Sequence, residues 1–233
     1  LWSTGDTTQT IYASATGTYS VTVGNGIVNS GNSLDFDGNS YIQGNSSPSL
    51  DVSQDNLLTI NAWVKQSPSN NLSTIVSHRS LTGPYQQYSM SINADNKLYF
   101  IAGSNTDNNF EVNGFNIGSD TISIGEWVHL SITYDGNSVR MYLNGNLNFE
   151  NFVNDTFSSN FIGELFIGSD NNNHLFNGEL DDINIWNTAL SQSEIQEYMN
   201  CPPTGNEAGL VGYWNMDEGT GTTLTDLSGN GND

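Results

Sequence analysis

Residues 125–148 read GEWVHLSITYDGNSVRMYLNGNLN. Apolar and polar side chains alternate through the first half of this stretch. The side chains expected on one side of an extended backbone are Val128, Leu130, Ile132 and Tyr134, and those on the other are Trp127, His129, Ser131 and Thr133. Two short breaks, at 135–137 (DGN) and 144–145 (NG), are tight-turn sequences. Alternation with a period of two residues between such turns predicts a hairpin or meander over residues 127–149.

The same pattern continues on both sides of this hairpin. Short alternating segments bounded by Gly, Asn, Asp or Pro include SLDFDG (33–38), LLTINAWVKQ (57–66), STIVSHR (73–79) and GELDDINIWN (178–187). One stretch departs from it, TALSQSEIQEYMN (188–200), in which Ser191 and Glu194 have the spacing of a helix capping box. Many short strands and a single short C-terminal helix predict an all-β sandwich of two antiparallel sheets.

The charge of the chain is strongly negative. Its 233 residues include 25 acidic side chains and only 4 lysines and arginines, which gives a net charge of −21. This charge repels phosphate backbones and anionic lipid surfaces, so we expect no nucleic-acid partner. No apolar run approaches the roughly 18 residues of a membrane span, so we expect no membrane insertion. It attracts divalent cations. The single cysteine, Cys201, excludes a disulfide within the chain.

Four motifs in order identify a family. SLDFDGNSYIQ, SLDVSQDNLLTINAWVK, GEWVHLSITYDGNSVRMYLNGN and FIGSDNNNHLFNGELDDINIWNTALSQSEI together resemble a concanavalin A-like jelly roll of the laminin-G type, related to the pentraxins. We expect this domain over residues 30–202. Residues 1–26 resemble the tail of an immunoglobulin-like module of bacterial surface proteins. Residues 208–233 resemble the opening strand and loop of a following laminin-G-like repeat, or they extend this domain's own sheet.

The acidic group in GELDD has three interpretations. Jelly-roll glucanases carry E-x-D-x-x-E on one strand, where two carboxylates flank the sugar bond. Glu179 and Asp181 match that motif, but Asn184 stands in place of the second glutamate and cannot act as a general acid. We therefore expect no enzyme activity. The second interpretation is a metal site, and the third is that these acids cap strand ends in water.

The metal interpretation follows from the family resemblance. Domains of this type commonly hold one calcium ion between their first and last strands, and calcium takes 6–8 oxygen ligands. The matching ligands here are Asp37 and Asp181, with a carbonyl near Asn39. Asp35 and Asp182 are second choices as ligands, and alternation along the strand directs the Asp182 side chain away from that of Asp181. Such a calcium would stabilise the fold without contacting a ligand.

Two loops are candidates for binding a ligand. Arg79 stands beside a loop that carries Tyr85 and Tyr88, and a cation with two tyrosines is able to stack on and hydrogen-bond to a sugar. The alternative is that these tyrosines cover the edge of the sheet. The pentraxin resemblance implies a second site in the loop 168–173, with Asp170 and Asn172 as its binding residues; Asp170 is the one charged residue there.

These expectations together predict a non-catalytic binding or adhesion module. Its partner would be a carbohydrate or a cell-surface ligand, and its cofactor calcium. The parent polypeptide would be secreted or displayed at the cell surface and would carry tandem domains. The alternative is a structural spacer in an adhesin stalk.

Overall fold

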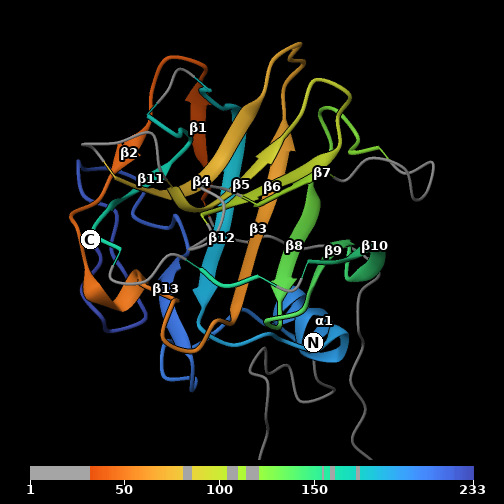
Figure 1. The fold of residues 1–233 in the computed structure, drawn as a ribbon. Helices are drawn as coiled ribbons and strands as arrows, with labels where there is room; N and C mark the ends of the chain where they lie inside the picture. The colour runs from red at the N-terminus through yellow and green to blue at the C-terminus, as the bar shows by residue number, and fades with distance from the viewer. Residues whose placement is uncertain are drawn as a thin grey trace, which may run out of the picture. The chain divides into compact units, whose positions relative to one another are not determined.

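The computed structural model describes residues 32–80, 86–103, 110–113, 121–153, 155–157, 161–171 and 174–233. The expectation for residues 1–26 lies outside these ranges. Two antiparallel sheets pack face to face, and in Figure 1 strands β4 to β7 lie in front of β12, β3 and β8 and cross them at an angle. This arrangement confirms the predicted jelly-roll sandwich.

The seven-stranded sheet contains the first and last strands of the sandwich. Its order is β1 (Leu34–Asp37), β12 (Asn177–Trp186), β3 (Leu58–Gln66), β8 (Val128–Tyr134), β9 (Ser138–Leu143) and β10 (Asn146–Phe152), with β13 (Leu210–Trp214) also paired to β12.

The six-stranded sheet forms the second layer. Its order is β2 (Ile42–Gln43), β11 (Glu164–Ile167), β4 (Ser73–Arg79), β5 (Gln86–Ile92), β6 (Leu98–Ala102) and β7 (Phe110–Asn113). A short 3-10 helix, η1 (Pro48–Leu50), lies between β2 and β3 in the chain.

The core lies between the two sheets and comes from alternate residues of their strands. In β8, Leu130 and Ile132 are fully buried there, and in β5 so are Met90 and Ile92. Full burial of such a side chain contributes about 1.5–3 kcal/mol. The alternation that predicts these strands therefore also selects the residues that hold the layers together.

The hairpin expected around 127–149 is confirmed. Strands β9 and β10 are joined by Asn144 and Gly145, whose φ angles are 49° and 70°. Two positive φ angles in a two-residue loop define the turn that matches the twist of a hairpin and favours the Asn-Gly pair. Gly145 is also required by packing, since a Cβ there would lie 2.8 Å from the Gln196 side chain.

The predicted helix is α1 (Gln192–Asn200), and both bonds of its capping box form. The Ser191 hydroxyl accepts from the Glu194 backbone N–H, and the Glu194 carboxylate accepts from the Ser191 backbone N–H. The helix covers the outer side of the seven-stranded sheet, where Ile195 packs with Trp186 and Tyr213. No helix in the described part of the chain has the length and apolarity needed to cross a bilayer.

The segment 208–233 packs on the sandwich. Strand β13 pairs with the second half of β12, at residues 183–186, and β1 pairs with the first half, at residues 177–180. Strand β13 buries Val211 and Trp214 in the main core. The described residues belong to one compact unit, residues 31–233, so this segment lies in the same unit as the other strands.

Candidate functional site

The first and last strands of the sandwich are neighbours. Strands β1 and β12 pair in antiparallel register, with Asp35 opposite Glu179 and Asp37 opposite Asn177. Asp181 lies four residues farther along β12, which at about 3.3 Å per residue is roughly 13 Å along the strand. The structure brings the two strands together but does not bring Asp37 next to Asp181.

The acids of β1 have partners of their own. The Asp37 carboxylate accepts from the Asn39 backbone N–H and the Ser40 hydroxyl, each at 2.9 Å, and these bonds lower the pKa of this exposed acid. Asp35 is exposed. Across from it, the Glu179 carboxylate accepts from Lys65 Nζ at 2.7 Å and from the Ser33 hydroxyl at 2.8 Å.

The acids of β12 are buried instead. Asp181 is 2% exposed and lies opposite Trp63, and its carboxylate accepts from the Asp182 backbone N–H at 2.7 Å. A bulge at this point gives Asp182 a φ of 46°. Burial raises the pKa of Asp182 to about 6, although the Tyr213 hydroxyl donates to it at 2.9 Å.

One calcium ion shared by Asp37 and Asp181 does not fit this register, because calcium holds its oxygens at about 2.3–2.6 Å. Within the described ranges, no group of three or more His, Cys, Asp and Glu residues is placed to hold a metal. Calcium binding by the chain stays a prediction. The glucanase motif fits no better, since Glu179 is paired with Lys65 and Asn184 accepts from Trp186 Nε1 at 2.7 Å.

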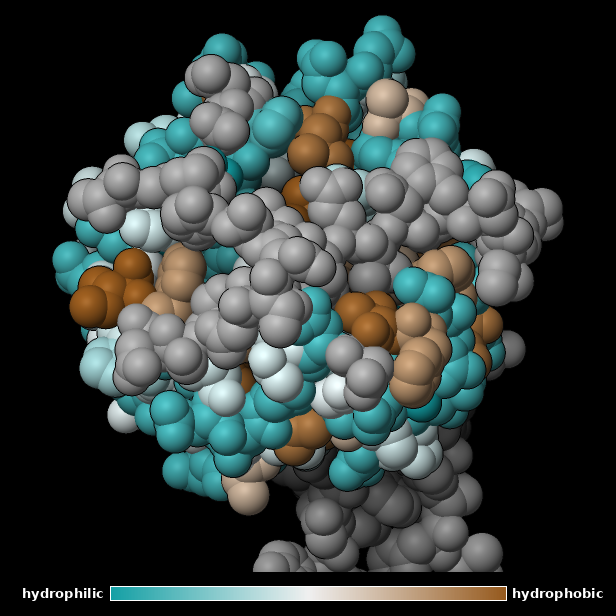
Figure 2. Space-filling view, in the orientation of Figure 1, coloured by the Kyte–Doolittle hydropathy of each residue, from teal (hydrophilic) through white to brown (hydrophobic). Residues whose placement is uncertain are grey.

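The outer side of the six-stranded sheet has a different chemistry, because strands β4 and β5 point hydroxyl groups there. The Ser91 hydroxyl donates to the Thr74 hydroxyl at 3.0 Å, and the Ser77 hydroxyl donates to the Ser169 carbonyl at 3.0 Å. All four side chains are buried. In the view of Figure 2, hydrophobic residues form separate small patches among hydrophilic ones. These hydroxyl residues therefore form a buried polar layer on the side of the sheet that faces away from the core.

Two of the predicted ligand-binding residues meet on this face. Arg79, at the end of β4, and Asp170, in the loop after β11, lie with Nη1 and Oδ2 3.7 Å apart. Asp170 Oδ2 also lies 2.7 Å from His174 Nδ1, and Arg79 donates to the Gln86 amide oxygen at 3.5 Å. The side chains of Arg79 and Asp170 are only 10% and 8% exposed, so the pair is buried.

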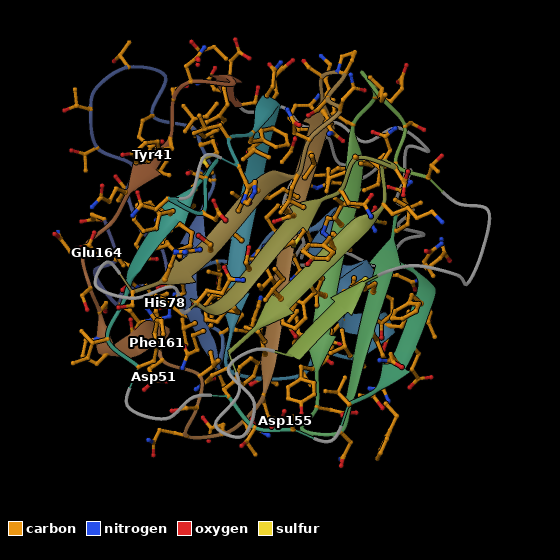
Figure 3. The ribbon with its side chains drawn as sticks, turned by 45° about the horizontal axis from the view of Figure 1, so that its top comes forward. Tyr41, Asp51, His78, Asp155, Phe161 and Glu164 are labelled. Atoms are coloured by element: carbon orange, nitrogen blue, oxygen red, sulfur yellow. The ribbon has the colours of Figure 1, made fainter. Side chains whose placement is uncertain are left out.

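One exposed aromatic residue lies at the edge of the same face, beside β2 and β11. Tyr41 is 44% exposed and packs on the fully buried Phe166, with ring centroids 6.0 Å apart. Gln43 lies opposite Phe166 in the β2–β11 register and donates its amide to the Glu164 carboxylate. Figure 3 shows Tyr41 and Glu164 along this edge of the sheet. We call Tyr41, Gln43, Glu164 and Phe166 the edge platform.

Sequence reasoning missed the edge platform. The signal was present in SYIQG, where Tyr41 and Gln43 are two residues apart and so share a face of a strand. The pairing of β2 with β11, about 120 residues away in the chain, was the missing information. Local alternation shows which side chains share a face but not which strand lies beside them.

The tyrosine expectation needs a correction. Tyr88 is fully buried in the core, opposite His78, and its hydroxyl donates to the Leu50 carbonyl at 3.2 Å. Tyr88 alternates along β5 with Met90 and Ile92, whose side chains also lie in the core, so Tyr88 cannot reach a ligand on the outer face. Tyr85 and Asn172 lie outside the described residues.

The imidazole rings of His78, on β4, and His129, on β8 of the other sheet, are both buried. His78 lies with Nδ1 3.1 Å from the Gln87 amide oxygen and Nε2 3.3 Å from the Gly163 carbonyl, and burial lowers its pKa. His129 is 3% exposed, and its ring centroid lies 5.1 Å from that of Trp63. Burial lowers the pKa of His129 to about 3. Both rings are neutral at physiological pH.

A cavity of about 440 Å³ lies behind β2. The Gly- and Thr-rich loop 218–224 forms one wall, and the other wall comes from residues 32–34 and Ile42. Ile42 points toward this cavity while its neighbours Tyr41 and Gln43 belong to the edge platform. The cavity and the platform therefore lie on opposite sides of one short strand.

Two antiparallel sheets packed face to face, with the first and last strands paired, place the chain in the class of jelly-roll sandwiches. Within that class, a family model described as the concanavalin A-like lectin/glucanases superfamily, of the laminin-G type, matches residues 36–196. The chain belongs to this family.

Solved structures with the same fold come from several sources. A candidate carbohydrate-binding protein from Bacteroides ovatus superposes with a TM-score of 0.63 at 16% identity, over 85% of this chain and 56% of that one. Domain 4 of AbnA, a GH43 extracellular arabinanase from Geobacillus stearothermophilus, was solved in complex with arabinotriose. It superposes with a TM-score of 0.57 at 22% identity, over 72% of this chain and 76% of that one. A heptameric SAP-like pentraxin from Limulus polyphemus superposes with a TM-score of 0.56 at 18% identity, over 82% of this chain and 89% of that one.

One curated relative is much longer than this chain. Mouse pappalysin-1 is 35% identical over 82 residues, which are 30% of this chain and 5% of that protein. The chain thus spans a small part of the relative that it matches.

Proposed function

We propose that the chain is a non-catalytic carbohydrate-binding module and that its ligand binds along the edge platform. The observation that carries this proposal is the exposed ring of Tyr41, packed on Phe166 and flanked by Gln43 and Glu164. An aromatic ring offers a flat apolar surface to the C–H face of a sugar. A neighbouring amide and carboxylate supply fixed partners for its hydroxyl groups.

The comparisons support this class of ligand. One structural neighbour is a candidate carbohydrate-binding protein, and another was solved in complex with arabinotriose. The proposal includes an extracellular or cell-surface setting and a parent protein in which several such domains follow one another. An adhesive role would follow from the same binding, because linked modules gain avidity without new contacts.

Catalysis is not part of the proposal. Glu179, the first acid of the glucanase-like motif, is held by Lys65 and Ser33, and Asp181 is buried against Trp63. A retaining glycosidase needs two carboxyl groups that flank the sugar bond about 5–5.5 Å apart and open to it. The acids of β12 do not provide such a pair.

Titration with arabinotriose and a neutral-glycan array tests the proposal. We expect Tyr41→Ala to weaken binding by about 10-fold or more, since loss of an aromatic contact at the centre of an interface commonly costs over about 1.4 kcal/mol. Phe152→Ala is the matched control. Phe152 is a 70% exposed aromatic residue on β10, in the other sheet, and its loss should leave binding unchanged.

Two results would contradict the proposal. If no glycan binds to the wild-type chain, the spacer interpretation is the better one. If a glycan binds and Tyr41→Ala has no effect, the ligand lies elsewhere, and the cavity behind β2 becomes the next candidate.

A further inference from the structure

Two of the four lysine and arginine side chains are paired with the chain's own acids away from the edge platform. Lys65 is paired with Glu179 at 2.7 Å, and Arg140 is paired with Asp135 at 2.6 Å and with Glu150 at 2.7 Å. Both cations lie on the seven-stranded sheet, in β3 and β9. A ligand on the edge platform would therefore not meet them.

The cation nearest to the edge platform is Arg79, which lies opposite Glu164 in the β4–β11 register. Its guanidinium is buried with the Asp170 carboxylate, beside His174. Drawing Arg79 toward an anionic ligand would leave Asp170 buried with a weaker partner, and removing one partner of a buried ion pair is strongly unfavourable. Arg79 therefore stabilises the fold through this buried ion pair and does not serve as a partner for an anionic ligand.

The fourth cation, Lys97, lies just before β6. Strand β6 is four positions from β2 in the sheet order, which corresponds to roughly 19 Å at about 4.8 Å per strand. That exceeds the screening length of about 8 Å at physiological salt. Among the histidines, His78 and His129 are buried with lowered pKa values.

The charge at the edge platform itself is negative. Glu164 is partly exposed beside Gln43, and the chain as a whole carries a net charge of −21. A ligand carboxylate or sulfate close to the Glu164 carboxylate would be repelled by it, and more strongly near a protein surface than in bulk water, because the effective dielectric constant is lower there.

We infer that the ligand of the edge platform is a neutral glycan, without carboxylate, sulfate or phosphate groups. This inference rests on the proposed function and specifies its ligand class. Recognition would depend on the Tyr41 ring and on hydrogen bonds to hydroxyl groups, which need no net charge.

The test compares matched neutral and anionic oligosaccharides by calorimetric titration of the full chain. The probes are arabinotriose, trigalacturonate and a heparin oligosaccharide, each with EDTA and with added calcium. We expect the anionic probes to bind about 10-fold or more weakly than the neutral one. We also expect neutral binding to change less than about 2-fold between about 0.1 M and about 1 M NaCl, although the Debye length falls from about 10 Å to about 3 Å.

Glu164→Gln provides an internal check, because it removes the carboxylate and keeps the shape. The difference in binding affinity between the neutral and the anionic probes should be smaller in this variant than in the wild type. The inference is overturned if an anionic probe binds the wild-type chain as tightly as the neutral one, with or without calcium, and loses its binding in Tyr41→Ala. That result would leave the proposed function standing, whereas a failure of every glycan to bind would remove both.

Discussion

Asp182 is a buried acid in a left-handed backbone conformation. Its φ of 46° comes from the bulge in β12, its side chain is almost fully buried, and burial raises its pKa to about 6 from 3.8. A raised folded-state pKa favours the fold when the acid is protonated. The contribution of Asp182 to the free energy of unfolding is fully present below the pKa of this acid in the unfolded chain, and it is lost as the pH rises through about 6. At neutral pH, Asp182 therefore opposes folding.

Replacement of Asp182 by asparagine should stabilise the protein at neutral pH. Asparagine tolerates a positive φ, and its amide oxygen is able to accept from the Tyr213 hydroxyl as the carboxylate does. We expect Asp182→Asn to raise the free energy of unfolding by about 1–2 kcal/mol at about pH 8 and to have little effect at about pH 4. Urea denaturation at the two pH values measures this difference.

Asp95→Asn serves as the control for that comparison, since Asp95 is exposed in the turn between β5 and β6. It should leave stability unchanged at both pH values. A gain in Asp182→Asn that is equal at both pH values would contradict the role given to burial of the charge.

Single residues also show what could be predicted from the sequence. Alternation in 125–148 correctly places Leu130 and Ile132 in the core, because each strand has one buried face. Alternation also accounts for Tyr88, which shares the core face of β5 with Met90 and Ile92; the expectation of a ligand-binding loop is wrong because β5 already begins at Gln86. Tyr41 was missed because its ring packs on Phe166, which lies in a distant strand.

Among the elements, β13 and the loop after it depend on one carboxylate. Asp226 Oδ1 accepts from the backbone N–H groups of Tyr213 and Ser228, and Oδ2 accepts from the Asn232 backbone N–H, with distances of 2.9–3.0 Å. Asp226 is 7% exposed. These bonds fix the loop against the strand that pairs with β12.

Loss of this carboxylate should destabilise the whole sandwich. Asp226→Ala leaves buried N–H groups without acceptors, and each such group costs about 1–3 kcal/mol. We expect a fall of about 2 kcal/mol or more in the free energy of unfolding, measured by denaturant titration. Asp217→Ala, which removes an exposed acid bonded to the Asn32 backbone N–H, should cost less than about 1 kcal/mol. Equal effects of the two variants would argue against a special role of the Asp226 carboxylate in holding the loop against β13.

Strand pairing illustrates the limit of a family resemblance at this scale. The resemblance implies that the first and last strands meet, and β1 and β12 do pair. It does not specify register, and in an antiparallel ladder each residue of offset moves a partner by about 3.3 Å. Asp37 faces Asn177 rather than Asp181, so the proposed ligand pair is separated although the strands are in contact.

At the scale of the whole molecule, the dominant electrostatic feature is the net charge of −21. Self-repulsion among so many acids opposes the compact state, and counter-ions reduce it. Because such screening depends on the charge and concentration of the ions and not on ligand geometry, it should be shared by different divalent cations.

Calcium and magnesium should therefore stabilise the protein to a similar degree. We expect both ions to raise the thermal midpoint by equal amounts at equal concentration, and EDTA alone to leave it unchanged, because Mg²⁺ and Ca²⁺ screen charge alike but require different ligand geometries. Differential scanning calorimetry of the wild type and of Asp37→Asn and Asp181→Asn measures this. A rise that is specific to calcium and lost in either variant would contradict it, because a carboxylate of β1 or β12 would then be a true calcium ligand.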